Sequence, residues 1–372
     1  MRPLVLGAGP AGCTAAIALV RGGARPLLLD RQAEVGDALC GGFLSWRTAA
    51  QLREVGCHPA ELGGWPVRRL RLFAGQRMVE AALPATGYGL SRRALDTALR
   101  AAAVRAGTEL AIDHARALGP GVVQGRERDW RGDAVFLAAG KHDVRGEARP
   151  REAADPALGV RVRVDGEPRV TRLVADAIEL HLFRGGYAGV VVQEGGSVNI
   201  CLALRKSLLA EAGGKPTALL ERLAEEHPQF GERLGGRVSE ETDTIAAVPY
   251  GYIARGTEAG LFRLGDQAAV IPSLAGEGMS IAVASGLAAA RAYLRGGPEA
   301  APTYQLAFAR RARRPVRTAQ LIWHLAEREW GARALLTAAG VAPPLANAAM
   351  HLSRIGQSSF TTQPWRSSTV PS

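Results

Sequence analysis

Apolar and polar residues follow two different patterns along this chain. In the first, continuous apolar runs at residues 2–6, 25–30, 133–140 and 260–266 are separated by segments rich in small apolar residues with helical spacing. Continuous runs predict parallel strands that are buried on both faces and joined by crossover helices. This part of the chain is therefore expected to form a Rossmann-type α/β sheet.

The second pattern is alternation. From about residue 159, apolar residues alternate with polar ones, which is typical of antiparallel strands with one buried face. The strands are expected at residues 160–164, 177–182, 189–193 and 197–204, with a hairpin at residues 67–73 and 78–83. Helices are expected at residues 46–55, with Ser45 as N-cap, and at residues 91–107, 217–226 and 278–294.

A glycine motif, Gly7-x-Gly9-x-x-Gly12, stands between the first apolar run and the first helix. Gly7 permits a tight turn, Gly9 lets a pyrophosphate approach the backbone, and Gly12 lets the helix lie close to the sheet. The second run ends in Asp30, where a carboxylate can accept hydrogen bonds from an adenosine ribose. The motif predicts a dinucleotide cofactor, with further contacts from Pro10, Ala11 and Arg31.

A second glycine-rich loop follows the fourth apolar run. After Gly265 and Asp266, the chain continues through a loop framed by Gly276 into a helix. A helix N-terminus stabilises the negative charge that two-electron reduction places on a flavin, and Asp266 can hydrogen-bond the ribityl chain. FAD is therefore the expected cofactor, and the remaining expected contacts at this end are Gly140, Pro272, Gly278 and Met279.

Together, the two motifs resemble those of FAD-dependent oxidoreductases of the p-hydroxybenzoate hydroxylase fold, over about residues 1–295. The segment SRRALD at residues 91–96 resembles the family's R-x-x-L/F-D helix start. This likeness implies that Arg92 lies over the flavin or its phosphates; otherwise it is a surface arginine.

Within that family, the segment ALCGGFLS at residues 38–45 resembles the CGG-x-L-S loop of the geranylgeranyl reductase-like group. That loop lies beside the isoalloxazine ring, which implies flavin contacts for Cys40 and Gly41. Cys40 is then the candidate catalytic residue, because a thiol there can shape the pocket or protonate an intermediate. A buried cysteine with no role in the reaction is the alternative.

The segments at residues 186–192 and 197–199 resemble the same group's GYxW…vN pattern, which implies that Tyr187, Gly189 and Asn199 line the substrate pocket. Gly189 replaces the tryptophan of that pattern, so the pocket is expected to suit something other than a long isoprenoid. Residues 138–145 lack the Asp-Gly pair that the monooxygenases associate with NAD(P)H. NAD(P)H remains the expected electron donor, with a ferredoxin-like donor as the alternative.

The patterns and the resemblance divide the chain into four parts. A discontinuous FAD-binding domain is expected from residues 1–65, 90–155 and 245–297, and an inserted β-rich substrate domain from residues 66–89 and 156–244. Residues 298–356 are expected to form a C-terminal helical segment. Residues 357–372 are polar and rich in serine and are expected to be a disordered tail.

The composition and charge of the chain restrict its possible partners and location. The chain has 372 residues and a formal charge of +11, and lysine occurs only at positions 141, 206 and 215. Its scattered arginines do not suggest nucleic-acid binding. The cluster at Arg310–Arg317 is either a solvated helix face or a weak contact with a membrane surface. The four cysteines suggest neither disulfides nor a metal site. Without an apolar stretch of spanning length, and with a structural strand at residue 2, we expect a cytoplasmic protein; its oligomeric state stays open.

Three functions fit these motifs. The favoured one is a single-component monooxygenase that hydroxylates an aromatic or polyketide-like molecule through a flavin C4a-hydroperoxide, an activity of secondary metabolism. The alternative is a geranylgeranyl reductase-like enzyme that reduces C=C bonds of a lipid or isoprenoid substrate. The remote alternative is a non-catalytic flavoprotein that acts through a partner.

Overall fold

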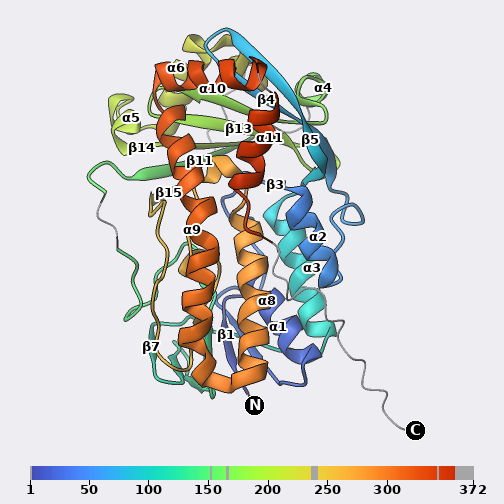
Figure 1. The fold of residues 1–372 in the computed structure, drawn as a ribbon, viewed down its shortest axis with the longest axis vertical. Helices are drawn as coiled ribbons and strands as arrows, with labels where there is room; N and C mark the ends of the chain where they lie inside the picture. Colours follow the sequence, from blue (N-terminus) through green and yellow to red (C-terminus); the bar gives the residue numbers. More distant parts are fainter. Residues whose placement is uncertain (1, 151–152, 165–166, 236–241, 342, 357–372) are drawn as a thin grey trace.

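The computed structural model describes residues 2–150, 153–164, 167–235, 242–341 and 343–356. The molecule is elongated, with one sheet at each end of its long axis and two long helices running between them (Figure 1). These helices are α8 (Gly278–Gly296) and α9 (Ala301–Ala326).

Sheet A holds the N-terminus and is wholly parallel. Its order is β16 (Leu261–Arg263), β10 (Val135–Leu137), β1 (Leu4–Leu6), β2 (Leu27–Asp30) and β6 (Glu109–Ile112). All four apolar runs form strands of this sheet, each shorter than its run. Helices α1 (Pro10–Arg21), α3 (Arg92–Arg105) and α8 pack together over one face in a single hydrophobic core. The Rossmann-type prediction is confirmed.

Two serines start helices where the sequence predicts. Ser45 caps α2 (Trp46–Glu54) by accepting a hydrogen bond from the backbone N–H of Thr48, at 3.3 Å. Ser91 caps α3 in the same way through the N–H of Ala94, at 3.1 Å. Each cap satisfies a backbone donor that has no partner inside the helix.

Sheet B contains the alternating segments. Its order is β15 (Asp243–Val248), β11 (Ala157–Val164), β14 (Val198–Arg205), β13 (Gly186–Val192), β12 (Ala177–Phe183), β4 (Trp65–Ala74), β5 (Arg77–Gly89) and β3 (Phe43–Leu44). Its strands pair antiparallel, as predicted, except that β12 pairs with β4 in parallel. A long excursion through sheet A separates these two strands, so no hairpin sets their relative direction.

Four short helices cover the outer face of sheet B, and their apolar side chains share one core with it. They are α4 (Pro168–Val174), α5 (Lys206–Glu211), α6 (Pro216–Glu226) and α7 (Pro228–Arg233). A small antiparallel sheet that the sequence reasoning missed lies beside sheet A. Its strands are β7 (Ala117–Gly119), β8 (Val122–Gln124) and β9 (Asp129–Arg131).

Two further helices follow α9, namely α10 (Glu329–Val341) and α11 (Pro343–Leu352). Figure 1 shows α10 across the sheet-B end of the molecule. The helical character predicted for residues 298–356 is thus observed in the described part of that range. The predicted disordered tail lies outside the described residues. Among the described helices, none is both long and apolar enough to cross a bilayer.

Candidate functional site

One cavity of about 520 Å³ connects the two glycine motifs with an apolar chamber on the inner face of sheet B. Most of the residues singled out in the sequence line it: Gly9, Pro10, Ala11, Cys40, Gly41, Arg92, Gly140, Tyr187, Gly189, Asp266, Gly276, Gly278 and Met279. Six lie outside its lining: Gly7, Gly12, Asp30, Arg31, Pro272 and Asn199. Motifs that are more than 250 residues apart in the sequence therefore face the same space.

The start of α1 forms a cradle that only glycine permits. A Cβ on Gly12 would lie 1.9 Å from the carbonyl oxygen of Gly7, and Gly7 itself has a left-handed φ of +105°. Gly9 faces open space, since a Cβ there would meet only the Arg92 guanidinium, at 3.6 Å. No side chain caps the helix, so its first-turn N–H groups stay free for an anion. This end fits a pyrophosphate.

Asp30 ends β2 beside this cradle. Its carboxylate accepts hydrogen bonds from the backbone N–H groups of Ala8, at 2.7 Å, and Gln32, at 2.9 Å. It also pairs with Arg100, at 3.3 Å. These partners hold the carboxylate in place, and its remaining lone pairs can accept ribose hydroxyls. The exposed Arg31 contacts the His142 ring instead, at 3.0 Å.

The start of α8 forms a second cradle. Gly276 has a left-handed φ of +65°, and a Cβ on Gly278 would have nothing within 4 Å. The side chain of the N-cap residue Glu277 does not cap the helix. Free N–H groups and the helix dipole therefore face the cavity, as a reduced flavin requires. Both cradles fit the two ends of FAD.

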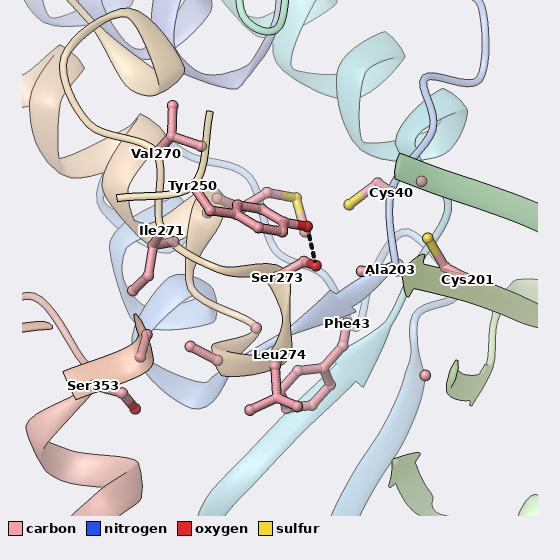
Figure 2. Close-up of a pocket in the computed structure, with 18 of the residues that line it drawn as sticks. Cys40, Phe43, Cys201, Ala203, Tyr250, Val270, Ile271, Ser273, Leu274 and Ser353 are labelled. Atoms are coloured by element: carbon pink, nitrogen blue, oxygen red, sulfur yellow. Dashed lines mark hydrogen bonds between the residues drawn. The ribbon is translucent and has the colours of Figure 1, made fainter. Parts of the chain in front are cut away.

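The loop that carries Cys40 is held by sheet B. The buried amide of Asn199, on β14, donates hydrogen bonds to the backbone carbonyls of Cys40, at 3.2 Å, and Gly41, at 3.0 Å. Asn199 thus contacts the loop that lines the cavity, without lining the cavity itself. Cys40 is half-buried, and its sulfur and that of Cys201 both face the pocket region (Figure 2).

Replacing Asn199 by leucine is expected to loosen this loop. Two partly buried carbonyls lose their donor, at roughly 1–3 kcal/mol each, so the affinity for FAD falls by about tenfold or more. Fluorescence titration of the apoprotein with FAD measures the change. Gln229→Leu is the control, because that amide lies on the far side of sheet B and makes one contact at 3.4 Å. Equal affinities in the two variants would show that Asn199 has no such role.

Three hydroxyl groups meet at the cavity wall. Tyr187 on β13 donates to the Ser273 oxygen, at 2.8 Å, and the Tyr250 hydroxyl lies 2.6 Å from the same atom. Figure 2 shows the Tyr250–Ser273 contact beside the pocket. Burial raises the pKa of Tyr250 to about 12 and that of Tyr187 well above its usual value. Both phenols therefore stay protonated at neutral pH.

Sequence reasoning found Tyr187 and missed the other two hydroxyls. Ser273 stands inside the predicted flavin loop, between Pro272 and Gly276. The presence of a hydroxyl-bearing residue in that loop was the sequence signal that could have identified Ser273 as a site residue. Tyr250 follows β15 and carried no local signal.

Most of the remaining chamber wall is apolar, with Lys141, Ser353 and Arg354 as the other polar residues in the lining. Alternate residues of β12 point into the chamber, and the wall continues over β4, α9 and α10. The aliphatic residues of this wall include Leu70, Leu72, Ile178, Leu180, Leu182 and Leu335. Gly189 lines the same space, and a Cβ there would meet ordinary contacts at 3.6 Å. No group of three or more histidine, cysteine or acidic side chains in the described ranges is arranged to hold a metal ion.

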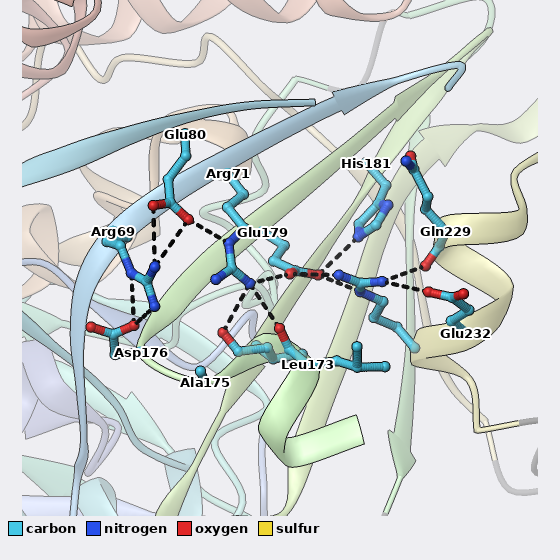
Figure 3. A network of polar contacts seen from close by, with 12 residues as sticks. Arg69, Arg71, Glu80, Leu173, Ala175, Asp176, Glu179, His181, Gln229 and Glu232 are labelled. Carbon is cyan, nitrogen blue, oxygen red and sulfur yellow. Dashed lines mark hydrogen bonds and ion pairs between the residues drawn. The ribbon is translucent and has the colours of Figure 1, made fainter. Parts of the chain in front are cut away.

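The opposite face of β12 carries charge. Glu179 is fully buried and accepts hydrogen bonds from Arg71, at 3.0 Å, and Arg233, at 2.8 Å, and it lies 3.2 Å from His181 (Figure 3). Burial alone would raise the pKa of Glu179, but the hydrogen bonds from His181 and Arg233 outweigh it and hold the pKa at about 2. The network ties β12 to β4 and α7 behind the cavity wall.

Because of this network, we expect the stability of the folded protein to fall at low pH. Because the pKa of Glu179 in the folded state lies below its ordinary value of 4.5, its stabilising effect is complete above pH 4.5 and is lost as pH falls toward 2. Glu179→Gln should lower the melting temperature at pH 7 and flatten its decline in acid. Thermal melts of both proteins across pH 7 to about 3 measure this. Parallel declines in the two proteins would exclude a contribution from Glu179.

Comparison with known proteins identifies relatives of this chain and solved structures that share its fold. No family model matches the chain. Digeranylgeranylglycerophospholipid reductase 2 of Methanopyrus kandleri is 30% identical over 302 residues, covering 76% of this chain and 74% of that protein. Reductase 1 of the same organism is 30% identical over 316 residues, covering 76% and 77%.

Solved structures share the fold at low identity. HpxO of Klebsiella pneumoniae, solved with FAD and uric acid, gives a TM-score of 0.75 at 16% identity and covers 95% of this chain and 96% of its own. A flavin-dependent brominase gives 0.73 at 14%, covering 95% and 93%. A geranylgeranyl bacteriochlorophyll reductase-like protein of Thermoplasma acidophilum gives 0.65 at 20%, covering 90% and 87%.

Proposed function

Because this chain belongs to the family of FAD-dependent oxidoreductases that includes the digeranylgeranylglycerophospholipid reductases, we propose that it reduces a carbon–carbon double bond of an apolar, isoprenoid-type substrate. The observation that carries the proposal is the single cavity, in which the cradles for both ends of FAD open into a chamber walled by aliphatic side chains. An alkene with no polar group near the double bond gains most of its binding free energy from such walls.

The residues at the two glycine motifs have separate tasks. The α1 cradle and Asp30 would hold the adenosine half of FAD, while the start of α8, Asp266 and the Cys40 loop would hold its ring. When bound and reduced, FAD supplies a hydride to the substrate. NAD(P)H is the proposed source of these electrons, and it would reach the flavin across the open side of the cavity.

Alkene reduction also needs a proton. The hydride forms a C–H bond at one alkene carbon, and the other carbon must take H⁺ from a group in the cavity wall. The Tyr250 hydroxyl is proposed as this donor, since it is protonated at neutral pH and Ser273 and Tyr187 connect it to a second phenol. Cys40 is proposed to shape the opposite side of the pocket.

A second candidate is hydroxylation of an aromatic molecule. Its specific support is the hydroxyl cluster itself, because Tyr250 and Ser273 can hydrogen-bond a polar substrate group as well as donate a proton. The small-molecule complex of HpxO agrees with this reading at the level of the fold. Gly189, in place of the tryptophan of the resembled pattern, lines the cavity without a side chain.

Anaerobic single-turnover kinetics test the proposal. The enzyme is reduced with dithionite and mixed without oxygen with a geranylgeranyl lipid, and the flavin absorbance is followed at the oxidised band. Reoxidation that depends on the lipid supports the reductase. Reoxidation only on admission of oxygen, accelerated by a phenolic compound, would replace it with the monooxygenase.

A further inference from the structure

Helices α10 and α11 are apolar to an unusual degree for helices at the surface. Between residues 329 and 352, the only acidic or basic residues besides His351 are Glu329 and Arg333. A surface helix in water normally presents a polar outer face. Most of the exposed positions of α10 are apolar as well, with Glu329, Arg333 and Thr337 as the exceptions, so water is a poor environment for this helix.

The outer face of α10 forms a continuous stripe. Trp330 is 61% exposed and Val341 is 81% exposed. Residues Ala334, Thr337 and Ala338, at the spacing that brings side chains onto one helix face, are exposed between them. We call these five residues the α10 stripe. It extends along the whole helix, whereas apolar residues scattered singly on a surface need no explanation.

A neighbouring strand extends this surface. Met78, at the start of β5, is 47% exposed, and the adjacent Val79 packs against the end of α10 at Gly340. Three exposed arginines flank the stripe: Arg77, Arg328 and Arg333. An apolar strip with Trp at one end and basic residues beside it has the composition of helices that lie in a membrane interface.

The other face of α10 lines the cavity. Leu335 and Ala339 line it, and Ala338 lies on the flank between the two faces, both exposed and lining the cavity. One helix therefore separates the apolar chamber from the outer apolar surface. A lipid substrate held in a bilayer against the stripe would lie against a helix that also walls the chamber.

We propose that the α10 stripe docks this protein on an anionic lipid surface, with α10 in the plane of the interface, and that the chamber receives its substrate there. The partner is a bilayer because the stripe combines apolar residues with a net basic flank, which matches lipid tails below anionic headgroups. The route into the chamber rests on the proposed function, whereas docking itself does not. The proposed docking surface is on α10, whereas a contact through the Arg310–Arg317 segment stays a prediction.

Vesicle flotation tests the docking. The full-length holoprotein is floated with vesicles of phosphatidylcholine containing about 30 mol% phosphatidylglycerol, and with pure phosphatidylcholine. We expect binding to the anionic vesicles that weakens with added salt. The double variant Trp330→Glu/Val341→Glu should lower the bound fraction about tenfold or more. Leu306→Glu is the matched control, because Leu306 is 49% exposed on α9 and lies outside the stripe.

Two flotation results would overturn the docking proposal. One is failure of the wild-type protein to float, and the other is equal binding by the double variant and the wild type. Light scattering that shows a dimer in the wild type and a monomer in the double variant would also overturn it, since the occupant is then a second copy. Flavin absorbance and melting temperature confirm that the variants are folded. Turnover of a short water-soluble alkene reports on the proposed function separately, because the double variant should retain it.

Discussion

Replacing Gly12 by alanine is expected to abolish stable FAD binding. The added Cβ would lie 1.9 Å from the carbonyl oxygen of Gly7, a backbone atom that cannot rotate away. Gly7 is itself closely surrounded, since a Cβ on it would lie 2.4 Å from the carbonyl oxygen of Ala138. Forced overpacking costs about 1–3 kcal/mol, so the affinity falls by roughly 10- to 100-fold or more. Flavin content after purification and titration of the apoprotein measure the loss.

The matched control is Gly256→Ala. A Cβ there has nothing within 4 Å, and Gly256 does not line the cavity. This variant should keep its flavin and its melting temperature. If Gly12→Ala retains full flavin content with unchanged affinity, the cradle at α1 does not hold the cofactor as described.

Replacing Tyr250 by phenylalanine should slow turnover about hundredfold while leaving FAD affinity unchanged. General acids typically contribute a factor of 10²–10⁴, and phenylalanine keeps the ring but removes the proton. The loss should fall on kcat more than on KM, because the apolar walls that bind the substrate remain. Steady-state kinetics with a geranylgeranyl lipid and a chemical or NAD(P)H donor measure both parameters.

Tyr252→Phe provides the control for this prediction. Tyr252 stands two residues further along the same segment and does not line the cavity. Ser273→Ala should reproduce part of the loss, because it breaks the contact between the two phenols. Unchanged kcat in Tyr250→Phe would exclude this hydroxyl as the proton donor.

The sequence predicts the cofactor end of the molecule well for a physical reason. Turns with left-handed glycines and helices that begin without side-chain caps are local features, and their residue types are nearly obligatory. Gly7 and Gly12 can therefore be identified without a structure, and so can the N-cap Ser45, whose residue type is typical of that position. The expected cofactor contacts line one cavity or lie next to it.

The substrate end depends on distant pairing. The parallel pairing of β12 with β4 decides which residues wall the chamber, and nothing in either segment encodes it. The hydroxyl groups of Tyr187, Tyr250 and Ser273 come from three separate segments, and long-range packing brings them together. Buried Glu179 was likewise missed, because its arginine partners lie on β4 and α7. Periodicity identifies the strands but not which strands become neighbours.

Product mass after anaerobic turnover tests the central claim most directly. The holoprotein, a geranylgeranyl lipid and an excess of reductant are incubated without oxygen, and the lipid is analysed by mass spectrometry. Reduction predicts a gain of two hydrogens for each double bond, formed without oxygen and lost in the Gly12→Ala variant. An unchanged lipid without oxygen, together with a product that gains one oxygen atom in air, would contradict the account.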